Sequence, residues 1–160
     1  LALHYLGRYA TTKARLQQYL ERELRERGWV ETAPVPDLEA LILEFADLGY
    51  VDDAGFAETR VRSMLRRGYG RARVVAALRH AGIDPELTNL ASRVNSDSER
   101  EAALAFARRR RLGPFGLPIV DHKTRERAIA AFIRAGHSYE IAREILETDA
   151  DSQNSADFLR

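Results

Sequence analysis

A short turn at residues 68–70, with a helix-length pattern on each side, most restricts what this chain can fold into. Before the turn, apolar residues recur at the three-to-five-residue spacing of a helix that buries one side. They are Phe56, Val61, Met64 and Leu65, and the corresponding series after the turn is Val74, Ala77, Leu78 and Ala81. The turn reads Gly-Tyr-Gly, and glycine stops a helix because it enters left-handed backbone conformations without steric cost. We therefore predict a helix pair, with Asp53 as the cap of the first helix and Gly82 at the end of the second.

Helical patterns continue along the rest of the chain, and no segment is typical of a strand. The clearest period places five apolar residues on one side of a helix: Leu38, Leu41, Ile42, Phe45 and Leu48. Leu90 and Ile133 are predicted to face inward on later helices. Residues that can accept hydrogen bonds from a first turn are predicted to start further helices: Thr11 or Thr12, Asp37, Asp84, Ser98 and Ser138. The chain is therefore predicted to be all-α, with about nine helices.

An internal repeat groups these helices in threes. Ala14-Arg15-Leu16 matches Ala72-Arg73-Val74, and the set Arg73, Ala81 and Gly82 matches Arg127, Ala135 and Gly136. A three-helix unit is too small to be stable alone, so stacked units are expected to bury their shared faces. We predict three tandem helix-turn-helix-like repeats in an elongated, curved arrangement. Their ranges are 1–50, 51–95 and 96–148, followed by a flexible acidic tail at 149–160.

Charge is unevenly distributed in a chain whose formal net charge is only +1. From 57 to 83 there are seven arginines and one acid, whereas 34–56 holds six acids and no base. The predicted partner-binding residues are Arg60, Arg62, Arg66, Arg67, Tyr69, Arg71 and Arg73. The arginines would contact acidic side chains or DNA phosphate, and Arg66, Arg67 and Arg71 are the best candidates because they flank the turn. The alternative for the arginines is a solvated face. Tyr69 either stacks on a base or a partner side chain, or packs over the turn.

The residues that catalysis or metal binding needs are absent or scattered. The chain has no cysteine, and its four histidines show no ligand spacing. Asp52 and Asp53 are interpreted as helix caps rather than as a catalytic pair. The longest apolar run, 128–133, is too short to cross a bilayer. We therefore predict no catalytic residue, no cofactor, no metal and no membrane partner.

The central stretch is similar to one known family. The residues that carry the similarity are Gly49-Tyr50-Val51-Asp52-Asp53, Phe56-Ala57, Arg67-Gly68-Tyr69-Gly70 and Gly82-Ile83. They resemble the RecX family, the regulatory proteins of the RecA recombinase, and the three repeats extend the resemblance over essentially the whole chain. The third repeat departs from the family pattern, because Gly136-His137 stands where the family commonly has glycine and phenylalanine.

The resemblance implies a cytoplasmic bacterial protein of DNA repair and the SOS response that binds and does not catalyse. It implies that the protein lies in the groove of the RecA filament on single-stranded DNA and restrains strand exchange, ATP hydrolysis and co-protease activity. Nothing in the sequence demands more than a monomer, and weak direct DNA contact is compatible with the arginines. The chain opens inside an amphipathic helix at Leu1, which is compatible with residues missing before it.

The alternative interpretation is a helix-turn-helix protein that binds DNA without RecA. The near-neutral net charge and the acidic stretch 34–56 argue against it.

Overall fold

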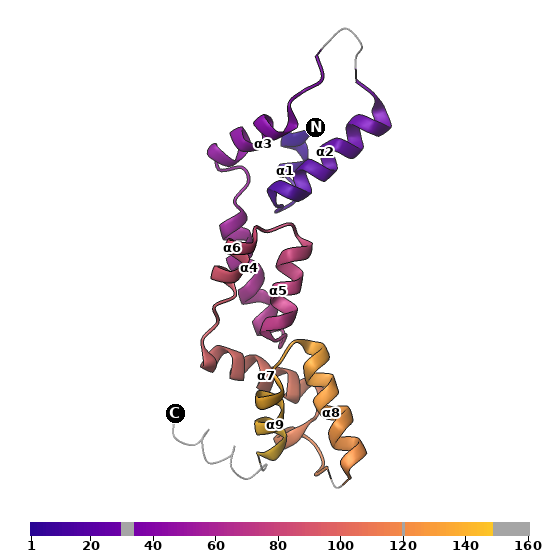
Figure 1. Cartoon of the computed structure of the whole chain (residues 1–160), viewed down its shortest axis with the longest axis vertical. Coiled ribbons are helices and arrows are strands. Elements are labelled where there is room, and N and C mark those ends of the chain that lie inside the picture. The colour runs from indigo at the N-terminus through magenta and orange to yellow at the C-terminus, as the bar shows by residue number, and fades with distance from the viewer. Residues whose placement is uncertain (30–33, 120, 149–160) are drawn as a thin grey trace. The chain divides into compact units, whose positions relative to one another are not determined.

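The computed structural model describes residues 1–29, 34–119 and 121–148 (Figure 1). In these ranges the chain forms nine α-helices and one 3-10 helix, and no strand. The elements are α1 (Ala2–Leu6), α2 (Lys13–Arg27), α3 (Leu38–Asp47), α4 (Asp53–Arg66), α5 (Arg71–His80), α6 (Pro85–Ala91), α7 (Ser96–Arg110), η1 (Gly113–Phe115), α8 (His122–Ala135) and α9 (Tyr139–Glu147). The all-α prediction is confirmed. The repeat boundaries and the curved arrangement stay predictions, and the tail predicted at 149–160 lies outside the described residues.

Local capping explains where most of these helices begin. The side-chain oxygens of Thr12, Asp37 and Ser138 accept hydrogen bonds from the first turns of α2, α3 and α9. Asp84 does the same for α6, accepting from the N–H of Glu86 at 2.8 Å. These bonds satisfy backbone N–H groups that have no partner within the helix. The caps predicted at these positions are confirmed.

Two predicted helix starts are wrong. Asp52, and not Asp53, caps α4, because its carboxylate accepts from the N–H of Gly55 at 3.0 Å. The Asp53 carboxylate instead accepts from the N–H of Lys13, at 2.9 Å. Helix α7 begins at Ser96 rather than at Ser98, because Asn95 is the residue that accepts from the N–H of Ser98.

Three apolar residues predicted to face inward are exposed. Leu48 is 62 % exposed, Leu90 60 % and Ile133 47 %. Leu48 directly follows the last residue of α3, at the end of the apolar row. For Leu90 and Ile133 the period gives the apolar side of a helix but not how far the neighbouring elements cover it.

The described contacts divide the chain into two compact units, and α4 and α5 contribute residues to both. Unit 1 consists of residues 1–59 and 78–91, and unit 2 consists of residues 60–77 and those from Ser92 onward. A buried cluster in unit 1 is formed by Ala2, Leu16, Leu20, Ile42 and Val51. The rings of Tyr5 and Tyr19 stack beside this cluster with centroids 4.1 Å apart, which joins α1 to α2.

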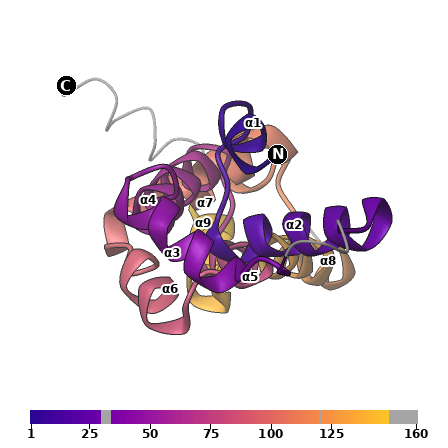
Figure 2. The same ribbon diagram turned by 90° about the horizontal axis from the view of Figure 1, so that it is seen from above.

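In unit 2 the helices α7, α8 and α9 lie close together (Figures 1 and 2), and the core that they share has an aromatic centre. The rings of Phe106 and Phe132 meet edge to face with centroids 4.9 Å apart. Around them lie Ala103, Ala107, Ala142 and Ile145, all essentially without solvent exposure. This buried cluster stabilises the bundle, because burying one large apolar side chain is worth about 1.5–3 kcal/mol.

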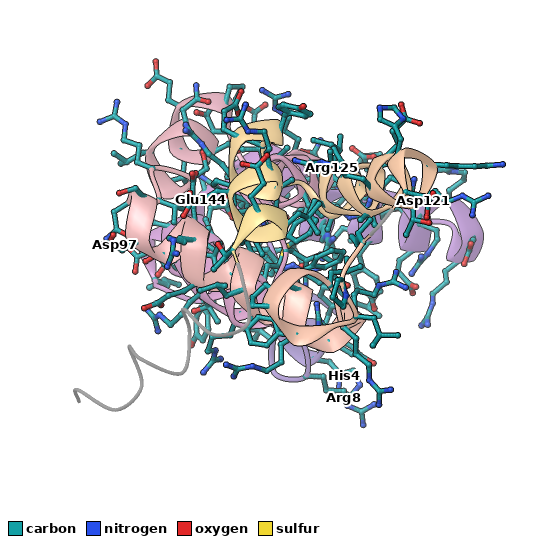
Figure 3. The ribbon with its side chains drawn as sticks, turned by 90° about the horizontal axis from the view of Figure 1, so that it is seen from below. His4, Arg8, Asp97, Asp121, Arg125 and Glu144 are labelled. Atoms are coloured by element: carbon teal, nitrogen blue, oxygen red, sulfur yellow. The ribbon has the colours of Figure 1, made fainter. Side chains whose placement is uncertain are left out.

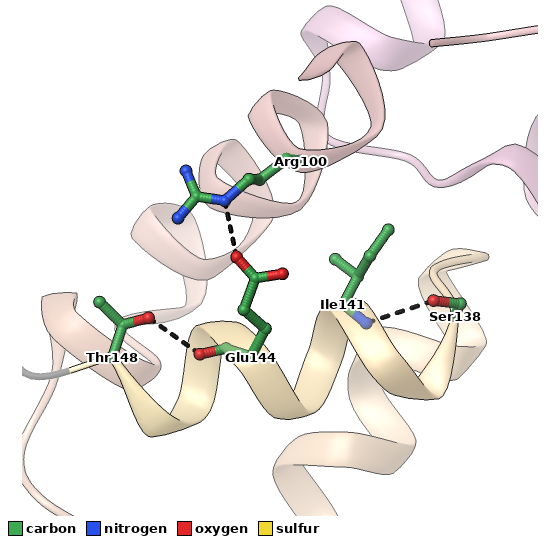
Figure 4. Close-up of polar contacts among 5 residues, drawn as sticks. All are labelled: Arg100, Ser138, Ile141, Glu144 and Thr148. Atoms are coloured by element: carbon green, nitrogen blue, oxygen red, sulfur yellow. Dashed lines mark hydrogen bonds and ion pairs between the residues drawn. The ribbon is translucent and has the colours of Figure 1, made fainter. Parts of the chain in front are cut away.

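Polar contacts then fix the ends of these helices. Arg100 on α7 pairs with Glu144 on α9 at 2.7 Å, while Thr148 donates to the carbonyl of Glu144 (Figure 4). Asp121 and Arg125 lie near the start of α8 (Figure 3), where Asp121 accepts from the N–H of Thr124. Hydrogen bonds from Thr124 hold the pKa of Asp121 below its usual value. The exposed ion pair between Arg100 and Glu144 is worth only about 0.2–1 kcal/mol.

Candidate partner-binding surface

The six predicted arginines all lie in unit 2, on α4, on α5 or in the turn between them. All six side chains are exposed: Arg60, Arg62, Arg66, Arg67, Arg71 and Arg73. In the described part of the chain, the ion pairs within 4.0 Å involve other cations, so none of the six is neutralised by a carboxylate of its own chain. With Tyr69, these residues are called the arginine surface below.

Helix geometry separates these arginines into groups. Since each residue of a helix advances by about 100°, Arg62 and Arg66 lie about 40° apart around α4. Arg60 lies about 160° from Arg62 by the same geometry. Arg60 is therefore on another side of α4, whereas Arg62 and Arg66 form one row that leads into the turn.

Tyr69 is half-buried and belongs to the turn itself. Its backbone N–H donates to the carbonyl of Met64 at 3.1 Å. The guanidinium carbon of Arg67 lies 5.8 Å from the centre of its ring, which is a cation–π distance. Arg67 is thereby held beside the tyrosine, and stacking of this ring on a partner stays a prediction.

The arginines on α5 lie where they do not favour their own helix. The N-terminus of a helix carries partial positive charge, so a cation there is unfavourable by about 0.3–1 kcal/mol at low salt. Arg71 and Arg73 lie in the first turn of α5, which contains no acid. Their position is therefore not explained by helix stability, unlike that of Arg66 in the last turn of α4. An anionic partner would remove this penalty.

Contacts within unit 2 hold the turn. The N–H of Gly70 donates to the carbonyl of Ala135 at 2.9 Å, and the N–H of Ala72 donates to that of Gly136 at 3.1 Å. A Cβ added at Gly70 would overlap the backbone of Gly136. Because the two backbones are in such close contact, the backbone of the turn has little room to move. The side chains of the turn therefore project from a rigid backbone.

His137 contacts the same turn with its side chain. It is only 5 % exposed and lies beside the rings of Phe106 and Phe132, and its Nε2 is 3.1 Å from the carbonyl oxygen of Gly68. Because a carbonyl only accepts, Nε2 must carry the hydrogen. Burial lowers the pKa of His137, and the bond to Gly68 opposes this shift. The departure from glycine–phenylalanine thus places a buried donor against the turn.

Sequence reasoning missed one neighbour of the turn. The guanidinium of Arg109, in the last turn of α7, lies against Gly68: its Nη2 would be 3.0 Å from a Cβ added there. No local pattern could have identified it, because the run 108–111 is equally well explained by its position at the C-terminal end of a helix.

The described residues offer no sign of metal chemistry or of a membrane span. They contain no group of three histidine, cysteine or acidic side chains that could hold a metal ion. Among the described helices, none combines the length and apolar character that crossing a bilayer requires. Asp52 and Asp53 are both engaged with backbone N–H groups.

Comparison with known proteins decides the family. Residues 52–91 match the family described as RecX, second three-helix domain. A regulatory protein RecX of Myxococcus xanthus is 32 % identical over 92 % of this chain and 83 % of its own length. The chain belongs to the RecX family. A second RecX, from Thermobifida fusca, is 33 % identical over 88 % of the chain and 82 % of its own length.

A solved structure has the same fold. The crystal structure of RecX from Lactobacillus salivarius is similar with a TM-score of 0.69 at 20 % identity, and the match covers 91 % of this chain and 90 % of that one. The similarity therefore extends well beyond the central helices that carry the sequence resemblance.

Proposed function

We propose that this RecX-family chain is a regulator that binds the RecA filament on single-stranded DNA and inhibits its recombinase, ATPase and co-protease activities. It acts in the cytoplasm as a monomer, in DNA repair and the SOS response, and it acts by binding rather than by catalysis. Family membership supports the regulatory role. The observation that carries the binding site is the set of exposed arginines on α4, on α5 and in the rigid turn between them, none of which has a carboxylate partner in the described ranges.

The arginine surface suits a filament because a filament is a periodic, charged partner. Each exposed guanidinium contributes only about 0.2–1 kcal/mol, so several must act together. Guanidinium groups pair with carboxylates and phosphates through two parallel hydrogen bonds, which adds geometric specificity. Binding built from such contacts weakens as salt screens them.

The first test is RecA-driven ATP hydrolysis on single-stranded DNA, titrated with this protein. We expect stoichiometric protein to inhibit hydrolysis, and inhibition to fall as salt rises. A matched RecA that hydrolyses ATP at an unchanged rate would contradict the proposal. Co-sedimentation with filaments, beside naked DNA, separates it from the alternative of DNA binding without RecA, which predicts equal recovery with both and a steep salt slope.

The second test removes the three arginines that flank the turn. Arg66→Ala, Arg67→Ala and Arg71→Ala combined should reduce inhibition of ATP hydrolysis at least about tenfold, if each contributes the upper part of the exposed-pair range. The matched control removes the same charge elsewhere, at exposed positions, by combining Arg8→Ala, Arg25→Ala and Arg93→Ala. Undiminished inhibition in the first triple variant, or equal loss in both, would exclude this surface as the site.

A further inference from the structure

A second surface in unit 2 combines apolar and cationic groups, and it does not include the arginine surface. A cavity of about 690 Å³ lies between the end of α7, the loop that holds η1, and α8. Its apolar lining includes Leu112, Phe115, Leu117 and Ile119, and four arginines also line it: Arg110, Arg111, Arg127 and Arg134. This cavity is called the loop cavity below.

The loop cavity is built by a tightly fastened loop. A Cβ at Gly116 would overlap the carbonyl of Arg111, and one at Gly113 would meet the carbonyl oxygen of Ile145. The guanidinium of Arg108 covers the ring of Phe115 at 5.0 Å from its centre. The first part of the loop, residues 113–116, is therefore held against α7 and α9, which fixes one wall of the cavity.

The charges of the loop cavity are of one sign. No acidic residue is among its lining residues, and within the described chain none of its four arginines lies within 4.0 Å of a carboxylate. The neighbouring Arg125 on α8 is instead paired with Glu147. The cationic rim is thus left for groups of another molecule.

The apolar part of the cavity is unusually open to solvent. Leu117 is 89 % exposed, more than any other large apolar side chain in the described ranges. Leu112, Phe115 and Ile119 are only partly buried. Exposed apolar groups framed by polar ones mark surfaces that bind other molecules. Because three of these four side chains are aliphatic, they fit a bulky apolar side chain better than a row of stacked bases, which need aromatic platforms.

We propose that the loop cavity binds an acidic peptide segment of a partner protein through one bulky apolar side chain of that segment. The anchor side chain packs on Leu112, Phe115 and Leu117, and flanking carboxylates pair with the arginines at the rim. The proposal stands apart from RecA inhibition, since it rests on other residues and its test needs no RecA.

The test uses fluorescence anisotropy with the full chain and three labelled probes. The first is Glu-Asp-Phe-Leu-Asp-Glu, the second is Glu-Asp-Gly-Ser-Asp-Glu, and the third is Lys-Lys-Phe-Leu-Lys-Lys. At low salt we expect the first probe to bind at least about tenfold more tightly than either of the others, because only it offers both carboxylates and an anchor. Equal binding of all three would overturn the proposal.

Variants then locate the binding. Arg127→Gln with Arg134→Gln should weaken the first probe about tenfold, whereas Lys123→Gln, an exposed change of charge on the same helix, should leave it unaltered. Arg111→Gly is a variant that keeps the fold, because Arg111 has φ +53°, a conformation that glycine adopts readily. It should lower affinity severalfold without lowering the melting temperature. Unchanged affinity in the double variant would place the probe elsewhere and overturn the proposal.

Two further measurements distinguish other occupants. Oligo-dT that binds this surface as tightly as the first probe, and fails to bind the double variant, would assign the cavity to nucleic acid and overturn the proposal. A chain ending at Thr148 lacks the acidic residues of 149–160. If this truncation raised affinity for the first probe more than about threefold, the chain's own segment would be the occupant, which also overturns the proposal. Unchanged affinity supports it.

Discussion

Two helix contacts, called junctions below, involve equivalent positions of the internal repeat. They differ in the groups that form them. At the first junction, in unit 1, Thr12 and Ala14 meet Ala81 and Gly82. At the second junction, in unit 2, Gly70 and Ala72 meet Ala135 and Gly136. The alignment of the first repeat with the second pairs Ala14 with Ala72 and Thr12 with Gly70. The alignment of the second repeat with the third pairs Gly82 with Gly136 and Ala81 with Ala135. Both junctions therefore join the same positions of successive repeats.

The acceptor is the same in both junctions, but the donor differs. Ala81 accepts from the hydroxyl of Thr12 at 2.6 Å, whereas Ala135 accepts from the backbone N–H of Gly70 at 2.9 Å. A Cβ at Gly82 would overlap only the methyl group of Ala14, but a Cβ at Gly136 would overlap the backbone nitrogen of Arg73. The first junction thus uses side chains, and the second brings two backbones together. The comparison shows that the positions at which the helices meet are the same in both junctions, whereas the groups that make the contact differ.

The largest expected effect is a loss of stability when one methyl group is added at each junction. Gly136→Ala should lower the free energy of unfolding by about 3–5 kcal/mol, since it combines a positive φ of 96° with a clash against backbone. Gly82→Ala should cost about 2 kcal/mol, because φ is 73° and the added methyl group overlaps one side-chain atom, the Cβ of Ala14, instead of several atoms of Gly70 and Arg73. Urea denaturation of both variants measures the difference. Equal losses would mean that the second junction is not the tighter one.

The next effect concerns the hydroxyl donor of the first junction. Thr12→Val should cost about 1–3 kcal/mol, because it leaves the buried carbonyl of Ala81 unpaired and removes the cap of α2. Thr11→Val is the matched control, since the Oγ1 of Thr11 is buried and has no hydrogen-bond partner among the residues that the structure describes. That change should be neutral or slightly stabilising in the same denaturation experiment. A loss in the control as large as that in Thr12→Val would contradict the assigned bond.

The third effect uses pH to test the histidine of the second junction. Because burial lowers the pKa of His137, the unfolded chain takes up a proton at higher pH than the folded chain. The contribution of His137 is therefore present above about pH 6.5 and is lost as the pH falls toward the lowered pKa, with a slope below about 1.4 kcal/mol per pH unit.

Replacing this histidine should remove that part of the pH dependence. His137→Phe keeps an aromatic ring beside Phe106 and Phe132 but does not titrate. The stability difference between wild type and variant, measured by urea denaturation at pH 7.5 and pH 5.5, should shift in favour of the variant at the lower pH. His80→Gln, at an exposed position, is the control. A difference that is the same at both pH values would show that burial does not keep His137 neutral in the folded chain.

The smallest expected effect is on stability at the arginine surface. The triple alanine variant at Arg66, Arg67 and Arg71 should change the free energy of unfolding by less than about 0.5 kcal/mol, as surface substitutions usually do. A loss of several kcal/mol would mean that these arginines hold the second junction together rather than binding a partner. Thermal unfolding by circular dichroism measures this and verifies helix content at the same time.

Much of the local structure could be predicted from the sequence because its causes are local. The caps at Asp37 and Ser138 follow from residue type and from the apolar period that comes after them, and the same pattern narrows the cap of α2 to Thr11 or Thr12. The turn at 68–70 follows from its glycines, and Gly68 has the positive φ, +74°, that glycine tolerates. The exposure of the six arginines was predictable for the same reason, since charged side chains are rarely buried without a partner.

The remaining features depend on contacts between distant parts of the chain. Asp52 and Asp53 are identical neighbours, and only the approach of Lys13, 40 positions away, assigns Asp53 to the start of α2. Arg109 joins the turn because α7 packs against Gly68. Leu90 has the spacing of a core residue, yet it is 60 % exposed. In each case the residue type allows two environments, and the packing of other elements selects one.

The sequence by itself determined that this chain is helical and where its helices end, because glycines, caps and apolar periods act within a few residues. It also determined the family, through the similarity of its residues to those of known proteins. The tertiary structure alone decided that His137 donates to Gly68 and that Thr12 donates to Ala81, each across 69 positions. It also decided which glycine meets a methyl group and which meets a backbone. The reason is physical: a buried polar group must find a partner, and which partner is within reach depends on how the helices pack.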